Sequence, residues 1–130
     1  MEGQQEIANQ LAQRVGISPE QASTAITLVS KTLLQKAEPS KASSLLSKLP
    51  PSITNIFSDN EKQQFTTTKQ TVSNEEVVRK LGTDAGIKDP KKAQQTTEEA
   101  VKLLQEKTGE GDLLNNVMGK FKNVDLNPLD

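Results

Sequence analysis

Residues 6–35, EIANQLAQRVGISPEQASTAITLVSKTLLQ, recur in order, with changes, as residues 76–105, EVVRKLGTDAGIKDPKKAQQTTEEAVKLLQ. The two stretches align without a gap from Glu6 and Glu76 up to the Gly-Ile pair that they share. A single insertion in the second copy then shifts the alignment, so that Pro19 matches Pro90. A repeat of this length indicates one structural unit that is used twice in the chain. We therefore predict two similar units, whose common structure decides the fold.

The repeated unit has the apolar spacing of two helices joined by a corner. Ile7, Leu11 and Val15 lie four residues apart, and their counterparts in the second copy are also apolar, which predicts a helix with one buried face. Gly16 follows at the position where a left-handed residue commonly ends a helix. The next helix should begin at Pro19, because a serine that can cap it comes directly before.

The rest of the chain completes an all-α prediction. Residues 40–49 are leucine-rich and suit a third short helix, and residues 113–121 have a comparable apolar pattern in the second unit. No segment alternates with the period of two that marks a strand. We predict a pseudo-duplicated helical bundle of about six helices. Its two similar units span residues 1–58 and 74–130 around a shared core, and the connector at 59–73 holds one or two helical turns.

The composition removes several classes of chemistry. The chain contains neither cysteine nor histidine, which excludes disulfides, thiolate metal sites and the commonest general base. We predict no catalytic, cofactor-binding or metal-binding residues, and hence no enzyme. An enzyme that uses carboxylates would need distant acidic groups to converge in one pocket.

Two pairs of adjacent carboxylates have a simpler interpretation than catalysis. Glu75-Glu76 and Glu98-Glu99 lie on predicted helices, and adjacent residues of a helix point in directions roughly 100° apart. Glu75, Glu76 and Glu98 each precede a basic residue by four positions. We therefore predict surface ion pairs with Arg79, Lys80 and Lys102.

Charge and hydropathy point to a protein of the cytoplasm. The net charge is −1, from 16 basic and 17 acidic side chains, without the bias of a polyanion-binding protein. No apolar run approaches the roughly 20 residues that span a bilayer. Residues 1–5 lack the basic and apolar regions of a secretory signal. We expect a cytoplasmic protein that does not enter a membrane.

The first corner resembles a known DNA-binding arrangement. The pattern Leu11-Ala12-x-x-Val15-Gly16-Ile17 resembles a helix-turn-helix and the first helix pair of the histone-like DNA-bending proteins. Those proteins grip DNA with β-arms, which have no counterpart here. The would-be recognition positions, residues 20–27, contain no basic side chain, although phosphate contacts require them.

The second corner is more basic than the first, and two further lysines lie near the end of the chain. Five of them are candidates for contact with an anion or a nucleic acid: Lys88, Lys91, Lys92, Lys120 and Lys122. A helix that begins beside three lysines can hold an anion. The acidic neighbours Asp84 and Asp89 weaken this prediction.

The helix-corner pattern, followed by a leucine-rich short helix and Leu49-Pro50, is also similar to small bacterial domains of unknown function, some of them carried on integron cassettes. The similarity covers residues 6–57 and, more faintly, residues 76–121. It implies a compact helical fold and a bacterial setting, and it implies no activity. The second unit departs from the pattern, because it has Val117-Met118 at the position equivalent to Leu49-Pro50.

By subtraction, the sequence favours a non-enzymatic interaction module that binds an unknown protein partner or further copies of itself. The expected contact is an apolar groove lined by five residues: Leu45, Leu49, Leu113, Val117 and Phe121. The composition favours a place in the core for the same leucines. The alternative is a nucleic-acid-associated protein that uses its two helix-turn-helix-like corners.

Overall fold

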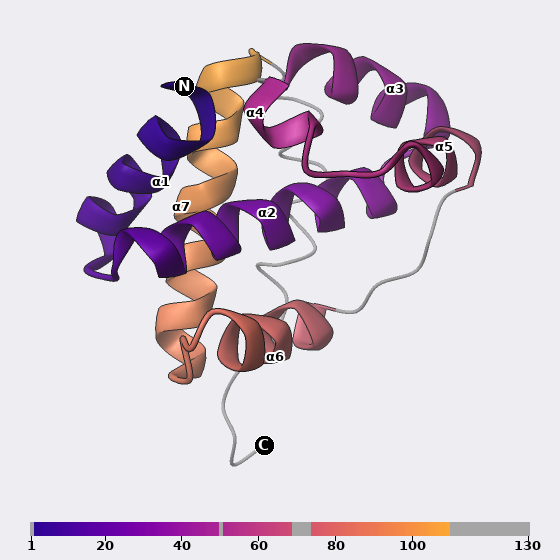
Figure 1. Cartoon of the computed structure of the whole chain (residues 1–130). Helices are drawn as coiled ribbons and strands as arrows, with labels where there is room; N and C mark the ends of the chain where they lie inside the picture. The colour runs from indigo at the N-terminus through magenta and orange to yellow at the C-terminus, as the bar shows by residue number, and fades with distance from the viewer. Residues whose placement is uncertain (1, 50, 69–73, 110–130) are drawn as a thin grey trace.

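The computed structural model describes residues 2–49, 51–68 and 74–109, and every regular element within them is an α-helix (Figure 1). The all-α prediction is confirmed for this part of the chain. The described residues form seven helices: α1 (Glu2–Val15), α2 (Pro19–Lys36), α3 (Pro39–Lys48), α4 (Pro51–Thr54), α5 (Asp59–Thr67), α6 (Asn74–Asp84) and α7 (Pro90–Thr108).

Helix α2 begins where the sequence predicts. The Ser18 hydroxyl accepts a hydrogen bond from the backbone N–H of Gln21, and the Gln21 side chain accepts one from the backbone N–H of Ser18, both at 3.0 Å. This capping box satisfies two of the N–H groups that a helix start leaves without partners. Pro19 takes the first helical position, where its missing N–H costs nothing.

The other helices are arranged around α2 (Figure 1). Helices α1 and α7 pack against it and against each other, and α6 contacts both α2 and α7. Helices α3 and α5 pack on each other and contact α2, while α4 lies against α1. Because α2 is covered from several sides, eight of its residues are buried: Ala22, Ala25, Ile26, Val29, Ser30, Thr32, Leu33 and Leu34.

The two helix corners have the same backbone conformation and pack against each other. Gly16 and Gly86 end α1 and α6 with φ angles of 76° and 74°, a region that favours glycine. A Cβ atom on Gly16 would lie 3.8 Å from Nζ of Lys92, and one on Gly86 would lie 3.4 Å from Nε2 of Gln21. Gln21 and Lys92 occupy equivalent places in the repeat. Each corner therefore contacts the same position of the other helix pair.

One hydrophobic core runs through the described part of the chain. Ile7 and Val77, equivalent in the repeat, are both buried. The two-unit duplication nevertheless stays a prediction, because the expected last helix of the second unit, residues 113–121, lies outside the described residues. Within the core, the hydroxyl of Ser30 is buried and has no hydrogen-bond partner.

The connector contains more helix than predicted. Helix α5 spans nine residues, about two and a half turns. A capping box between Ser58 and Glu61 starts it, with bonds of 3.1 and 2.9 Å. Phe65 anchors it by packing edge-to-face on Phe57, with ring centroids 5.4 Å apart. This cap and the buried aromatic residue stabilise a longer helix than the apolar pattern of the connector predicted.

Helix α5 is also joined to the central helix by an ion pair. Nζ of Lys31 in α2 lies 3.3 Å from Oε2 of Glu61. The backbone N–H of Ser58 and, secondarily, Lys31 lower the pKa of the Glu61 carboxyl, although partial desolvation opposes them. The carboxylate of Glu61 therefore contributes both to the cap of α5 and to its attachment.

Candidate binding surface at the α6–α7 corner

The segment between α6 and α7 is held by backbone hydrogen bonds and by one cap. The backbone N–H of Ile87 donates to the carbonyl oxygen of Leu81 at 3.0 Å, which folds the chain back after Gly86. The carboxylate of Asp89 then accepts a hydrogen bond of 3.1 Å from the backbone N–H of Lys91 and caps α7. Lys88 lies between these two constraints and is exposed.

The three lysines predicted at this corner have different surroundings. Lys88 and Lys91 are exposed. Lys92 is half-buried, and its Nζ atom donates a hydrogen bond of 2.7 Å to the backbone carbonyl oxygen of Val15, at the end of α1. Lys92 therefore caps α1, whereas Lys88 and Lys91 face solvent. The other two candidates, Lys120 and Lys122, lie outside the described residues.

A shallow, open depression lies at this corner. We call it the α6–α7 depression, and its lining consists of Val78, Arg79, Gly82, Thr83, Lys88 and Pro90. Val78 and Pro90 are partly buried apolar residues, while Arg79 and Lys88 are exposed. The depression thus combines an apolar lining with two positive charges.

Neither cation of the depression is paired within the described part of the chain. No ion pair or hydrogen bond joins the side chain of Arg79 or Lys88 to another described residue. Two nearby acids are engaged locally instead: the carboxylate of Asp84 accepts from the Thr83 hydroxyl at 3.2 Å, and Asp89 caps α7. Within the described residues, Arg79 and Lys88 therefore have no acidic partner and can pair with an external anionic group.

Arg79 was missed as a candidate because its spacing predicted a pair with Glu75. That prediction is wrong, since both side chains are exposed and no ion pair joins them. The matching prediction for Glu76 is confirmed, with a distance of 3.6 Å to Nζ of Lys80. The four-residue spacing is the same in both cases, so the sequence alone could not show which arginine or lysine stays unpaired.

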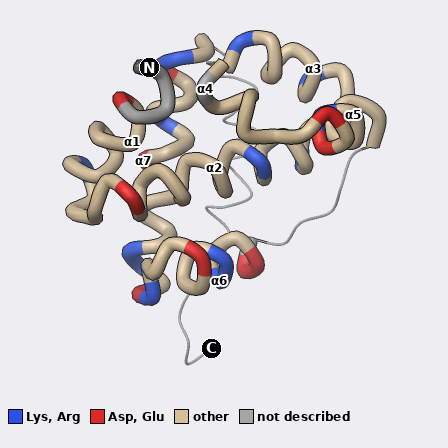
Figure 2. The backbone as a smooth tube through the Cα atoms, viewed as in Figure 1, with Lys and Arg blue, Asp and Glu red and all other residues tan. Residues whose placement is uncertain are grey.

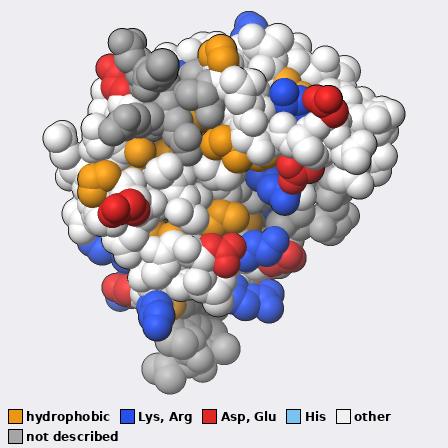
Figure 3. Space-filling model, viewed as in Figure 1, with side chains coloured by type: hydrophobic (Ala, Val, Ile, Leu, Met, Phe, Trp, Pro, Cys, Tyr) orange, Lys and Arg blue, Asp and Glu red, His pale blue; other side chains and the backbone are white. Residues whose placement is uncertain are grey.

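The charges around the depression are mixed in sign. Figure 2 shows basic and acidic positions alternating along α6 and the start of α7, and Figure 3 shows blue and red side chains interspersed on the visible face. Residues 75–92 contain five basic and four acidic side chains. The corner is therefore a place for a local ionic contact and lacks the continuous positive surface that binds a nucleic-acid backbone.

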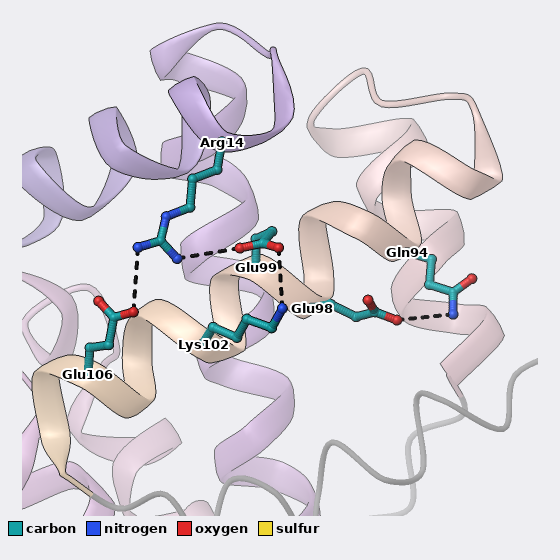
Figure 4. Close-up of polar contacts among 6 residues, drawn as sticks. All are labelled: Arg14, Gln94, Glu98, Glu99, Lys102 and Glu106. Atoms are coloured by element: carbon teal, nitrogen blue, oxygen red, sulfur yellow. Dashed lines mark hydrogen bonds and ion pairs between the residues drawn. The ribbon is translucent and has the colours of Figure 1, made fainter.

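The paired carboxylates of α7 form structural contacts (Figure 4). Arg14 of α1 lies 3.4 Å from Glu99 and 3.4 Å from Glu106. Lys102 also pairs with Glu99, at 3.5 Å. The predicted pair of Glu98 with Lys102 is wrong, because Glu98 instead accepts a hydrogen bond of 3.3 Å from Gln94.

This arrangement has a simple cause in helix geometry. Glu99 and Glu106 are seven residues apart and therefore lie on the same face of α7, where one guanidinium group can reach both. A further pair, between Lys107 of α7 and Glu6 of α1 at 3.6 Å, extends the contact along both helices. These carboxylates join α1 to α7 and do not converge on a pocket.

The apolar groove does not exist in the predicted form. Leu45 and Leu49 are 1% and 5% exposed and belong to the hydrophobic core, and α3 packs on α5, α2 and α7. Leu113, Val117 and Phe121 lie outside the described residues. Among the residues that the structure describes, there is no helix apolar and long enough to cross a bilayer, and no group of three or more acidic residues suited to a metal ion.

The comparisons with known proteins place the chain in a family. A profile described as an uncharacterized conserved protein family, DUF2267, matches residues 4–121. The chain belongs to DUF2267. This membership confirms the resemblance to small domains of unknown function, although the bacterial setting and the integron association stay predictions. Comparison of this DUF2267 chain with curated proteins and with solved structures gave no match.

Proposed function

We propose that this DUF2267 protein is a non-enzymatic helical module that acts by binding a protein partner or further copies of itself. The observation that carries the proposal is the α6–α7 depression. An apolar lining beside two cations that have no partner among the described residues suits a polypeptide that presents an apolar side chain next to an acidic one. The backbone hydrogen bonds and the cap at this corner support this use, because a surface that they hold in place loses little freedom when it binds.

The carboxylates are also better explained by structure than by catalysis. Glu99 and Glu106 bind Arg14, Glu61 caps α5, and Asp89 caps α7. The backbone N–H of Ser58 lowers the pKa of Glu61, whereas a carboxyl that serves as a general acid near neutral pH needs a raised pKa. These acidic groups support the fold.

The nucleic-acid alternative receives less support from the two corners. The first turn of α2 would be the reading element of a helix-turn-helix, yet it carries exposed Glu20, and Gln21 lies against Gly86 of the other corner. Lys92 is bound to Val15. Only Lys88 and Lys91 remain exposed among the described candidates, and two lysines give a small electrostatic contribution to phosphate binding.

Affinity capture from the native host, with mass spectrometry, tests the proposal without assuming a ligand class. The wild-type chain would be compared with the double variant Arg79→Glu/Lys88→Glu and with the control Lys41→Glu, which changes an exposed lysine on α3. We expect the wild type and the control to retain a protein that the double variant loses. Capture of nucleic acid that high salt removes, with no protein retained, would contradict the proposal and support the alternative.

A further inference from the structure

A second surface feature lies at the junction of α4 and α5. Ile56 is 42% exposed. Among the described residues, it is the large hydrophobic side chain that lies in solvent. The cause is local: the backbone N–H groups of Ile56 and Phe57 bond to the carbonyls of Ile53 and Thr54, at 3.1 and 3.2 Å, and form a tight turn. Phe57 points inward in this turn and packs on Phe65, which leaves the preceding side chain in solvent.

An acidic residue lies close to Ile56 in the sequence. Asp59, three residues on, is exposed and forms no ion pair or hydrogen bond with its side chain in the described part of the chain. Asn55 and Asn60 beside them are also exposed. We call Asn55, Ile56, Asp59 and Asn60 the α4–α5 ridge. It offers an apolar side chain and a negative charge on a short segment.

The ridge and the α6–α7 depression have complementary chemistry. Ile56 matches the apolar lining formed by Val78 and Pro90. Asp59 matches the unpaired positive charges of Arg79 and Lys88. The two surfaces lie in separate parts of the molecule, with α4 and α5 on one side of α2 and α6 on the other (Figure 1). They therefore cannot meet within one chain, but they can meet between two chains.

We propose that the α4–α5 ridge of one copy docks in the α6–α7 depression of a second copy. This inference rests on the proposed interaction function and names the partner as the protein itself. The contact joins two different surfaces, so it is heterologous and adds copies head to tail. The ridge has four residues, whereas a standard interface uses roughly 20–30 residues a side, so association should be weak and should appear only at high protein concentration.

Charge-reversal variants of the full chain, followed by sedimentation equilibrium, test this contact. Arg79→Glu and Asp59→Lys should each weaken self-association by at least about tenfold, because each places like charges together across the contact. Ile56→Ser should weaken it through lost apolar burial. Lys41→Glu carries the same charge change as Arg79→Glu outside both surfaces and should leave association unchanged. Circular dichroism of each variant checks that the helices remain.

Mixing the two charge variants provides the decisive measurement. The Arg79→Glu chain keeps an intact ridge and the Asp59→Lys chain keeps an intact depression, so the mixture should associate when neither protein does alone. A mixture that stays monomeric, or a wild-type chain that is monomeric at every concentration, would overturn the self-docking proposal. If affinity capture still finds another protein that depends on Arg79 and Lys88, the interaction function stands while self-docking fails. If the chain neither associates with itself nor captures a protein that depends on Arg79 and Lys88, the proposed function fails as well.

Discussion

The Nζ atom of Lys92 lies 2.7 Å from the backbone carbonyl oxygen of Val15, which joins the start of α7 to the end of α1. The carbonyl groups at the end of a helix have no partners within it and carry partial negative charge. An ammonium group satisfies one of them and complements the helix dipole. A lysine that the sequence offers as an anion-binding residue thus serves as a cap between two distant segments.

Lys92→Met should lower the free energy of unfolding by about 1–2 kcal/mol, because it removes a half-buried, charge-assisted hydrogen bond but keeps the aliphatic stem. Lys91→Met is the matched control, since Lys91 is exposed and adjacent, and it should change stability by less than about 0.5 kcal/mol. Chemical denaturation measures both values. Equal effects of the two substitutions would show that the contact with Val15 contributes nothing.

Replacing Gly82 in α6 and Gly86 at its corner with alanine should change the stability of the protein in opposite directions. Gly86→Ala should destabilise by about 1–2 kcal/mol, because φ at Gly86 is 74°, a conformation that a Cβ atom disfavours. Gly82→Ala should stabilise by about 0.5–1 kcal/mol through helix propensity. Its Cβ would meet only ordinary contacts, the nearest at 3.5 Å from the carbonyl oxygen of Ile87. Thermal unfolding of both variants tests this, and a stabilising Gly86→Ala would exclude the left-handed corner.

Ser30→Ala should stabilise the protein by about 1 kcal/mol, because the buried hydroxyl of Ser30 has no hydrogen-bond partner and folding removes it from water without compensation. Alanine also favours the helix. Thr97→Val is the comparison, because the buried Thr97 hydroxyl donates to the carbonyl oxygen of Ala93 at 2.9 Å. Denaturant midpoints measure the difference. A destabilising Ser30→Ala would mean that this hydroxyl has a partner in solution.

Glu61→Gln should change how stability depends on pH. The pKa of Glu61 is lowered in the folded protein from an ordinary value of 4.5, so its carboxylate stabilises the fold above that pH. This contribution is lost as the pH falls through the lowered pKa. We expect the wild type to be more stable than Glu61→Gln at neutral pH and the difference to shrink on acidification below about pH 4.5. Urea titrations at several pH values check this, and a constant difference would contradict it.

The repeat and its spacing were sufficient to predict the helical class and the positions of the main helices. Ser18-Pro19 and Asp89-Pro90 mark the starts of α2 and α7 because capping depends on local residues. The candidate surface was harder to predict, since it depends on contacts between distant segments. Lys92 and Arg79 look alike in sequence as exposed cations near a corner. Only the packing of α7 on α1 shows that Lys92 is bound to Val15, whereas Arg79 has no partner among the described residues.

The position of α2 has a consequence for how the chain is made. Its apolar surface is covered partly by α1 and partly by α7, and a ribosome completes α7 only after all the other described helices. Until then, the apolar face of α2 that α7 covers stays exposed on the nascent chain. Chaperones recognise surfaces of this kind, and such surfaces promote aggregation. Synthesis that stops before α7 would release a fragment prone to aggregation, whereas a product that includes α7 can bury that flank.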